Sequence, residues 1–258
     1  MRLMKRILSA AAVLALSASL LVGCSSGTAS SVPVSASSAA ESTVSSVEET
    51  ASSAVDENEA AAAQLLNDLT GSYQELWPVI LADEYKQTWL DDCTALVGED
   101  NAEAAFEKPS SMVTGDVYGE DAVKAYANGG GAYFCGFTNS LATLTFDGET
   151  STISGTDKDG NVLFSHTYHY IGMEPVHGLY EFESDDADSG EFTYFFLAPD
   201  TSAETYHIEF RYGSDAEALS QYDAGEYAYW VASGISTDCD QTMIDNCIEL
   251  FCTENLAG

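Results

Sequence analysis

Two side chains that alternate along one predicted strand, those of His207 and Glu209, are able to share a metal ion. They stand two positions apart in a run whose opposite face, with Ile208, Phe210 and Tyr212, is apolar. Residues i and i+2 of a strand leave the same face roughly 6.5–7 Å apart, and imidazole and carboxylate groups are ordinary zinc ligands. The pattern predicts a transition-metal site centred on these two side chains, with Zn²⁺ as the ion.

The same alternation is also typical of a polar strand face that binds nothing. Arg211 continues the face and would then pair with Glu209 in a surface ion pair of little energetic consequence. Two protein ligands make a poor zinc site, so a third donor must come from elsewhere in the chain. His177, in the turn between Gly172 and Gly178, is the first candidate, and a carboxylate or a water molecule is the second.

The other two histidines are not expected to join this site. His166 and His169 are three positions apart in a segment of period two, so their side chains leave opposite faces of a strand. His169 lies between Tyr168 and Tyr170 and is most simply a solvent-side residue. The chain also lacks the Gly-x-Ser-x-Gly, phosphate-loop and His-Glu-x-x-His motifs. We therefore expect that the protein is not an enzyme.

The segments around these residues predict helices on either side of a run of strands. Helical patterns cover 57–66, 83–96, part of 114–128, and 237–251, where Thr237 has the sequence of an N-cap. Seven strand-like segments follow one another, with hairpin signals at Asp147-Gly148 and Asp159-Gly160: 132–137, 141–146, 151–155, 161–170, 178–183, 192–198 and 206–212. Sequential antiparallel strands close more easily as a barrel than as a sandwich with crossovers. The expected fold is therefore mainly β, an antiparallel β-barrel with peripheral helices.

The first 23 residues have the composition of an export signal. Basic residues at positions 2, 5 and 6 precede an apolar stretch from Ile7 to Val22, the order typical of a secretory signal peptide. Leu21-Val-Gly-Cys24 resembles the bacterial lipobox, which implies a diacylglycerol on Cys24 and a protein anchored on the extracytoplasmic face of the cell membrane. An ordinary signal peptide with a chance cysteine, or a membrane-spanning anchor, is the alternative, although the apolar run is short for a span.

Composition separates a tether from a folded domain. Residues 24–59 are mostly Ser, Ala, Thr, Val and Glu without an aromatic residue, so they bury too little apolar surface to fold. Residues 60–258 hold the aromatic residues and form the expected domain. The 258-residue chain has 42 acidic and 8 basic residues and a formal charge of -34. This charge disfavours binding to nucleic acid or to anionic lipid through a basic face, and it attracts cations.

Five cysteines follow Cys24, and their spacing matches neither a zinc knuckle nor a Cys-x-x-Cys motif. They are Cys93, Cys135, Cys239, Cys247 and Cys252. An odd number leaves at least one free thiol, and the pairing within any disulfide stays open. Cys247 lies on an apolar helical face, where a small buried hydrophobic residue is the usual meaning.

Several segments together resemble one protein family. They are Leu69–Pro78, Tyr168–Gly172, Gly178–Glu183, the pair Ala198-Pro199 followed by His207-Ile-Glu209, and Gly234–Thr237. In order and spacing they resemble the ZinT/YodA domain family over essentially all of residues 60–255. The resemblance implies a lipocalin-like (calycin) barrel that binds zinc outside the cytoplasm. Some members pass zinc to an ABC importer, which would then be a partner of this chain.

The chain departs from this family at the metal site. The three histidines that the family uses align with Phe195, His207 and Glu209. One histidine is kept, one is replaced by a carboxylate that still suits zinc, and one is replaced by an apolar ring. Two functions therefore stay open. One is an extracytoplasmic zinc-binding lipoprotein that buffers zinc or delivers it to an importer. The other is a barrel that has lost the metal and binds a small apolar ligand or a protein partner.

Overall fold

The computed structural model describes residues 57–127, 131–199 and 207–256. The predicted signal peptide, Cys24 and nearly all of the predicted tether lie outside these residues. Apart from Glu57, the described residues belong to one compact unit, Asn58–Gly258. Within the described residues, no helix is both long and apolar enough to cross a bilayer.

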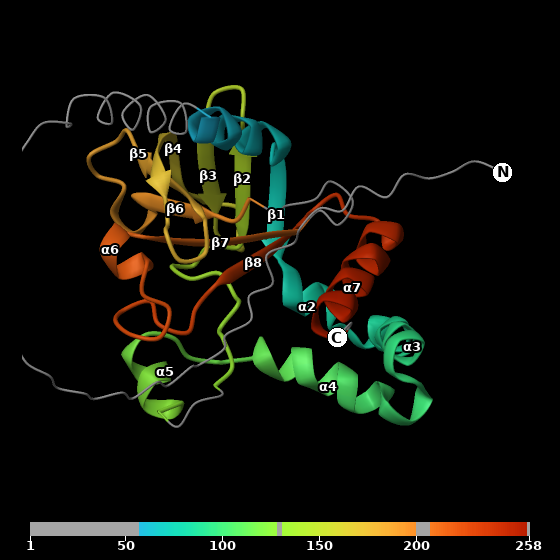
Figure 1. Ribbon diagram of the computed structural model, residues 1–258. Coiled ribbons are helices and arrows are strands. Elements are labelled where there is room, and N and C mark those ends of the chain that lie inside the picture. The colour runs from blue at the N-terminus through green and yellow to red at the C-terminus, as the bar shows by residue number, and fades with distance from the viewer. Residues whose placement is uncertain (1–56, 128–130, 200–206, 257–258) are drawn as a thin grey trace, which may run out of the picture. The chain divides into compact units, whose positions relative to one another are not determined.

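The described residues contain a closed barrel in which each strand is antiparallel to the next and β1 pairs with β8. Its strands are β1 (Gly71–Glu75), β2 (Thr143–Asp147), β3 (Thr152–Thr156), β4 (Val162–Met173), β5 (Tyr180–Ser184), β6 (Tyr194–Leu197), β7 (His207–Gly213) and β8 (Ala232–Ser236). The strand order follows the chain without a crossover (Figure 1). The predicted fold class, a lipocalin-like antiparallel β-barrel with peripheral helices, is confirmed.

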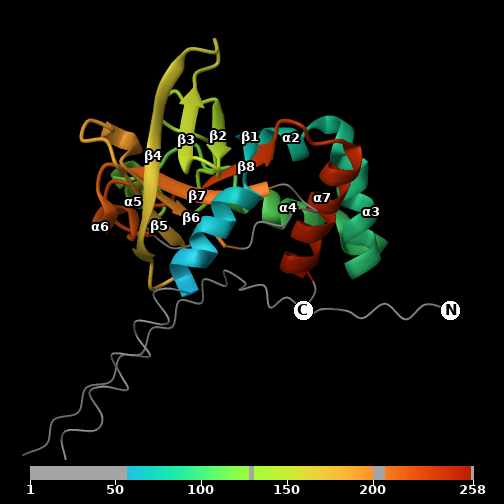
Figure 2. The same cartoon turned by 90° about the horizontal axis from the view of Figure 1, so that it is seen from above.

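Helices lie before, between and after the strands. A first helix covers residues 57–68. The others are α2 (Leu76–Ile80), α3 (Lys86–Val97), α4 (Ala102–Met112), α5 (Glu120–Ala125), α6 (Ala216–Leu219) and α7 (Gln241–Leu256), with 3₁₀ turns at Asp83–Tyr85, Glu99–Asn101 and Gly190–Phe192. Figures 1 and 2 show α3, α4 and α7 together on one side of the barrel. The cap of α7 is Asp240 rather than the predicted Thr237, because the Asp240 carboxylate accepts from the backbone N–H of Met243 at 3.0 Å.

The domain has two separate hydrophobic cores. Buried side chains from every strand fill the lumen of the barrel: Tyr73, Leu144, Phe146, Ile153, Phe164, Tyr168, Phe182, Phe195, Leu197, Ile208, Phe210, Tyr212 and Ala232. Leu65 and Leu66 of the first helix pack on this core, and the helix lies across one end of the barrel (Figure 1). A second core joins α2, α3, α4 and α7 to Ile235 of β8. The outer surface of the barrel at β8 is therefore part of a helix–sheet interface.

One predicted element was wrong, and several elements of the structure were not predicted. The segment 132–137 is not a strand, since Phe134 makes single bridges to Thr114 and to Trp230, which belong to different segments. β1 and β8 were not predicted, because each has five residues and neither alternates clearly between apolar and polar side chains. α4 was missed as well: Pro109 lies inside it, and its stability comes from packing in the second core.

Candidate functional site

Strand β7 sends its side chains to two different environments. Ile208, Phe210 and Tyr212 point into the lumen core, as the alternation of the sequence predicts. His207 and Glu209 therefore point outward, and they pair with Ile235 and Ser233 of β8. Directly paired residues of an antiparallel ladder share a face, and Ile235 belongs to the second core. The predicted ligands thus face the helices that cover the barrel.

Helix α7 buries this outer face. The side chain of Phe251 on α7 lies edge-on to the imidazole of His207, with 5.3 Å between the ring centroids. His207 is only 6% exposed, and Glu209 is half-buried. The two side chains are therefore not part of a solvated polar face, which was the alternative interpretation of the sequence pattern.

Two thiols lie near Glu209. Burial, and then the charge of Glu209, raises the pKa of the Cys135 thiol to about 12. Burial also raises the pKa of the Cys247 thiol to about 12, with smaller contributions from Cys239 and Glu209. The backbone places Cys135 here directly, because its carbonyl accepts from the N–H of Ser233, the β8 residue that pairs with Glu209, at 3.0 Å. Cys135 and Cys247 of α7 thus lie in the core that packs against the face of the barrel to which His207 and Glu209 point.

The sequence did not indicate that Cys135 or Cys247 belongs with His207 and Glu209. Cys135 comes from the bridging segment before β2, and Cys247 comes from α7, so the cluster unites three distant parts of the chain. The helical pattern correctly predicted that Cys247 is buried. The helical pattern could not predict which residues surround the Cys247 thiol, because they depend on how α7 packs on the barrel.

His177 lies at the other end of the outer face of β7. Its ring centroid is 3.9 Å from that of Tyr222, and the Tyr222 ring in turn lies 4.3 Å from the guanidinium carbon of Arg211. Arg211 is four residues from His207, which is roughly 13 Å along a strand. The Nδ1 atom of His177 is 3.4 Å from the buried carboxylate of Glu174. His177 therefore belongs to a cluster around Arg211.

The candidate ligands do not converge on one point in this structure. Within the described residues, no group of three His, Cys, Asp or Glu side chains has the arrangement needed to hold a metal. His207, Glu209 and His177 consequently do not form a preformed three-ligand site. Their role as ligands stays a prediction that needs a binding measurement.

Phe195 faces away from His207 and Glu209. It pairs directly with Tyr212 on β7, so both rings point into the lumen. Its ring stacks on those of Tyr212 at 5.4 Å and Phe210 at 6.3 Å. A histidine at position 195 would therefore not lie beside Glu209. The packed rings also argue against an apolar ligand in this part of the lumen.

Arg211 does not form the surface ion pair that the sequence suggested, because its side chain is fully buried. Its guanidinium donates to the backbone carbonyls of Leu219 and Tyr227, and at 3.3 Å to that of Gln221. Burial is the main cause that lowers its pKa, and a guanidinium keeps its charge in proteins. Through these hydrogen bonds Arg211 holds the segment 219–227 against the outer face of β7.

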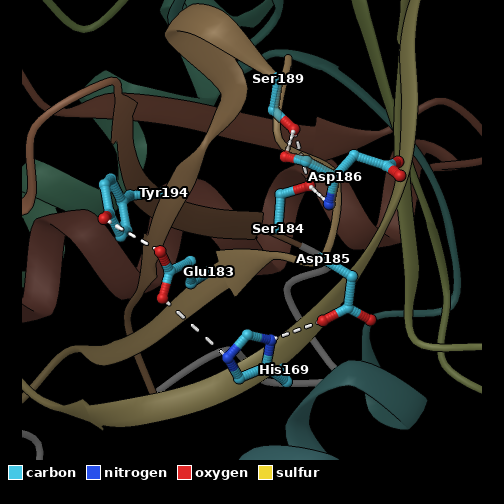
Figure 3. A network of polar contacts seen from close by, with 7 residues as sticks. All are labelled: His169, Glu183, Ser184, Asp185, Asp186, Ser189 and Tyr194. Carbon is cyan, nitrogen blue, oxygen red and sulfur yellow. Dashed lines mark hydrogen bonds and ion pairs between the residues drawn. The ribbon is translucent and has the colours of Figure 1, made fainter.

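The remaining histidines lie on β4, among carboxylates. Figure 3 shows His169 between Asp185, whose Oδ1 is 2.7 Å from Nδ1, and Glu183, whose Oε2 is 4.0 Å from Nε2. His166 Nδ1 is 2.7 Å from Asp186 Oδ2. The side chain of His166 is 16% exposed and that of His169 is 53% exposed, and the ring of His166 stacks on Phe164 of the lumen core. The two histidines point to opposite faces, as predicted.

A surface cleft reaches the edge of the candidate site. It has a volume of about 330 Å³ and is lined by Glu75, Trp77, Pro78, Leu81, Val113, Thr114, Gly115, Phe134, Cys135 and Gly136. Cys135 is the residue that this cleft shares with the cluster around Glu209. The cleft therefore leads from the surface of the helical layer to one of the two thiols.

Comparison with known protein families gives no match, and neither does comparison with characterised proteins. Solved structures that match this chain include two from Streptococcus pneumoniae. The Zn(II)-bound ZinT-like domain of Streptococcus pneumoniae AdcA is 15% identical, with a TM-score of 0.45, over 71% of this chain and 89% of that domain. Zn(II)-bound AdcA from Streptococcus pneumoniae is 17% identical, with a TM-score of 0.41, over 72% of this chain and 35% of AdcA. This chain therefore spans about a third of AdcA, and its ligand must be argued from its own residues.

Proposed function

We propose that the protein is a lipid-anchored extracytoplasmic domain that binds a divalent transition metal, Zn²⁺ first, as its cargo. One observation supports this most directly: the face of the barrel that carries His207 and Glu209 packs against a core that contains the thiols of Cys135 and Cys247. Nitrogen, carboxylate and thiolate donors are the ligands that zinc takes in proteins. The net charge of -34 favours the approach of cations over anions.

Under this proposal His207 and Glu209 are two of the ligands, and the third donor is a thiol. Cys135 and Cys247 are better placed than His177, because both belong to the core that packs on this face of the barrel, whereas His177 packs beside Tyr222 and Arg211. The described side chains do not converge on one point, so binding requires rotation of side chains within the cluster. Cys135 also borders the surface cleft, which gives an ion a route toward the cluster.

Anchoring and delivery complete the proposal. Lipid on Cys24 would hold the domain at the outer face of the membrane, and the segment 24–59 would separate it from the lipid. The partner expected from the sequence resemblance is a zinc ABC importer. Labelled fatty acid should enter the exported protein but not its Cys24→Ala variant. Label in that variant at the unmodified protein's level would contradict the anchor.

Titration calorimetry of the purified full-length protein with ZnCl₂ tests metal binding. His207→Ala should weaken binding by more than about 100-fold, because even residues outside the ligand shell contribute about 10–100-fold. Glu209→Gln should weaken it less, since a carboxamide oxygen remains. Cys135→Ser and Cys247→Ser then identify the thiol ligand, and His177→Ala tests the earlier prediction.

The matched control is His169→Ala, which removes a histidine that also has carboxylate neighbours but lies on the exposed face of β4. Its zinc affinity should equal that of the unmodified protein. Unfolding temperatures of all variants are measured alongside, because His207 is buried. Absence of zinc binding to the unmodified protein, or equal affinity in the folded His207→Ala variant, would overturn the proposal.

A further inference from the structure

Two cysteines are in contact between helices α3 and α7 of the second core. Cys93 on α3 and Cys252 on α7 have their sulfur atoms 3.7 Å apart. Both residues are completely buried. A distance of 3.7 Å is direct contact between two thiols, and a disulfide requires a further approach to about 2.05 Å.

The other cysteines have different surroundings. Among the five cysteines that the structure describes, Cys93 and Cys252 form the sulfur–sulfur contact. The sulfur of Cys135 is 3.8 Å from the backbone oxygen of Tyr133, and Cys247 lies near Glu209. The contact geometry therefore selects one pairing out of those that the sequence left open.

We propose that Cys93 and Cys252 are a disulfide-forming pair that joins α3 to α7 when the protein folds in an oxidising environment. The oxidant is a small-molecule or protein disulfide. The thiolate of one cysteine attacks a sulfur of that disulfide and releases one thiol of the oxidant. The thiolate of the second cysteine then attacks the mixed disulfide and releases the other thiol. The two cysteines lose two protons and two electrons, and the oxidant is reduced to two thiols.

We expect this reaction to occur during folding rather than after it, because both cysteines are buried in the folded protein. Burial is also the largest cause that raises the pKa of both thiols in the folded protein, so few thiolates form there. Before α3 and α7 pack, both thiols are accessible and have ordinary reactivity. A protein that folds before oxidation should therefore keep the pair reduced for longer than one refolded with an oxidant present.

The disulfide would close a long loop in the unfolded chain. Cys93 and Cys252 are 159 positions apart in the chain, and a disulfide stabilises a protein mainly by restricting its unfolded state, more so for longer loops. We expect the oxidised protein to unfold roughly 10 °C above the reduced one, given the usual stabilisation and the size of the domain. The bond would also hold α7 in its place over His207.

The test is to refold the purified full-length protein with oxidised glutathione, block free thiols with N-ethylmaleimide in denaturant, and map the peptides by mass spectrometry. The peptides of Cys93 and Cys252 should be joined, and reduction should separate them. Those of Cys135, Cys239 and Cys247 should carry the maleimide. No metal is present, so the outcome is independent of the function proposed above.

Two variants sharpen the test. Cys93→Ala should leave Cys252 alkylated, whereas Cys247→Ala, a change on the same helix, should leave the joined peptide intact. The peptide map reads the pairing even where a variant is less stable. Alkylation of all five cysteines in the protein refolded with oxidised glutathione, or a different joined pair, would overturn the proposal.

Discussion

Strands β7 and β4 each carry a histidine on the outer face of the barrel with a carboxylate near it in the chain or in space, and the two places differ in what covers them. On β7, His207 lies under α7 at 6% exposure, with Glu209 beside it. On β4, His169 lies between Asp185 and Glu183 with half of its side chain in solvent (Figure 3). Both places contain the same residue types on a strand of period two. A helix that packs over one of them creates the difference in environment.

This difference decides how much each place contributes to stability. Exposed ion pairs are worth about 0–1 kcal/mol, because water and salt screen the charges. Buried polar groups that lose their partners cost several times as much, since they cannot turn to water. We therefore expect substitutions on the outer face of β7 to have large effects and those on the outer face of β4 to have small ones.

The largest loss of stability should come from Arg211→Ala. The buried guanidinium satisfies backbone carbonyls in the segment 219–227, and its removal leaves them without a donor. Chemical denaturation should show the free energy of unfolding falling by about 3–5 kcal/mol. The control is Lys86→Ala, which breaks the exposed pair with Glu103 and should change it by less than about 1 kcal/mol. Equal losses in the two variants would contradict the comparison.

The next largest effect should come from Phe251→Ala, which removes the ring of α7 that covers His207. Phe251 also packs on Trp77, with 4.8 Å between their ring centroids. The cavity that its loss leaves should lower the free energy of unfolding by about 3–4 kcal/mol. Diethylpyrocarbonate should then modify His207 at a rate closer to that of His169. Met112→Ala is the control, because Met112 is 48% exposed. If the rate at His207 stays low in Phe251→Ala, another group covers the imidazole.

Phe195→His distinguishes the strand register from the family alignment. The new imidazole would enter the lumen, where Phe195 is surrounded by aromatic rings, and burying it without a partner should lower the free energy of unfolding by about 2–3 kcal/mol. Zinc affinity measured by calorimetry should not increase. A gain in zinc affinity that also depends on His207 would show that position 195 can reach the outer face of β7.

The sequence predicted the barrel and the two faces of β7 because both follow from local alternation. Ile208, Phe210 and Tyr212 identify the lumen side wherever the strand sits in the sheet. The surroundings of the outer face were not predictable in the same way. They depend on α7, which joins the barrel from the far end of the chain, and on Cys135, which lies in a segment held by single bridges. The buried role of Arg211 was missed for the same reason, since its partners are backbone carbonyls of a loop without a sequence pattern.

The smallest effect should come from Asp185→Asn, which changes the carboxylate that follows β5 and contacts His169 on the exposed face of β4. Asp185 Oδ1 contacts His169 Nδ1 at 2.7 Å, yet both side chains are more than half exposed, so the solvent replaces the lost interaction. The free energy of unfolding should change by less than about 0.5 kcal/mol, and less still in high salt. The chemical shifts of the His169 ring should respond while those of His207 do not. A loss as large as that of Phe251→Ala would mean that carboxylate contact, rather than burial under α7, sets the importance of a histidine on this barrel.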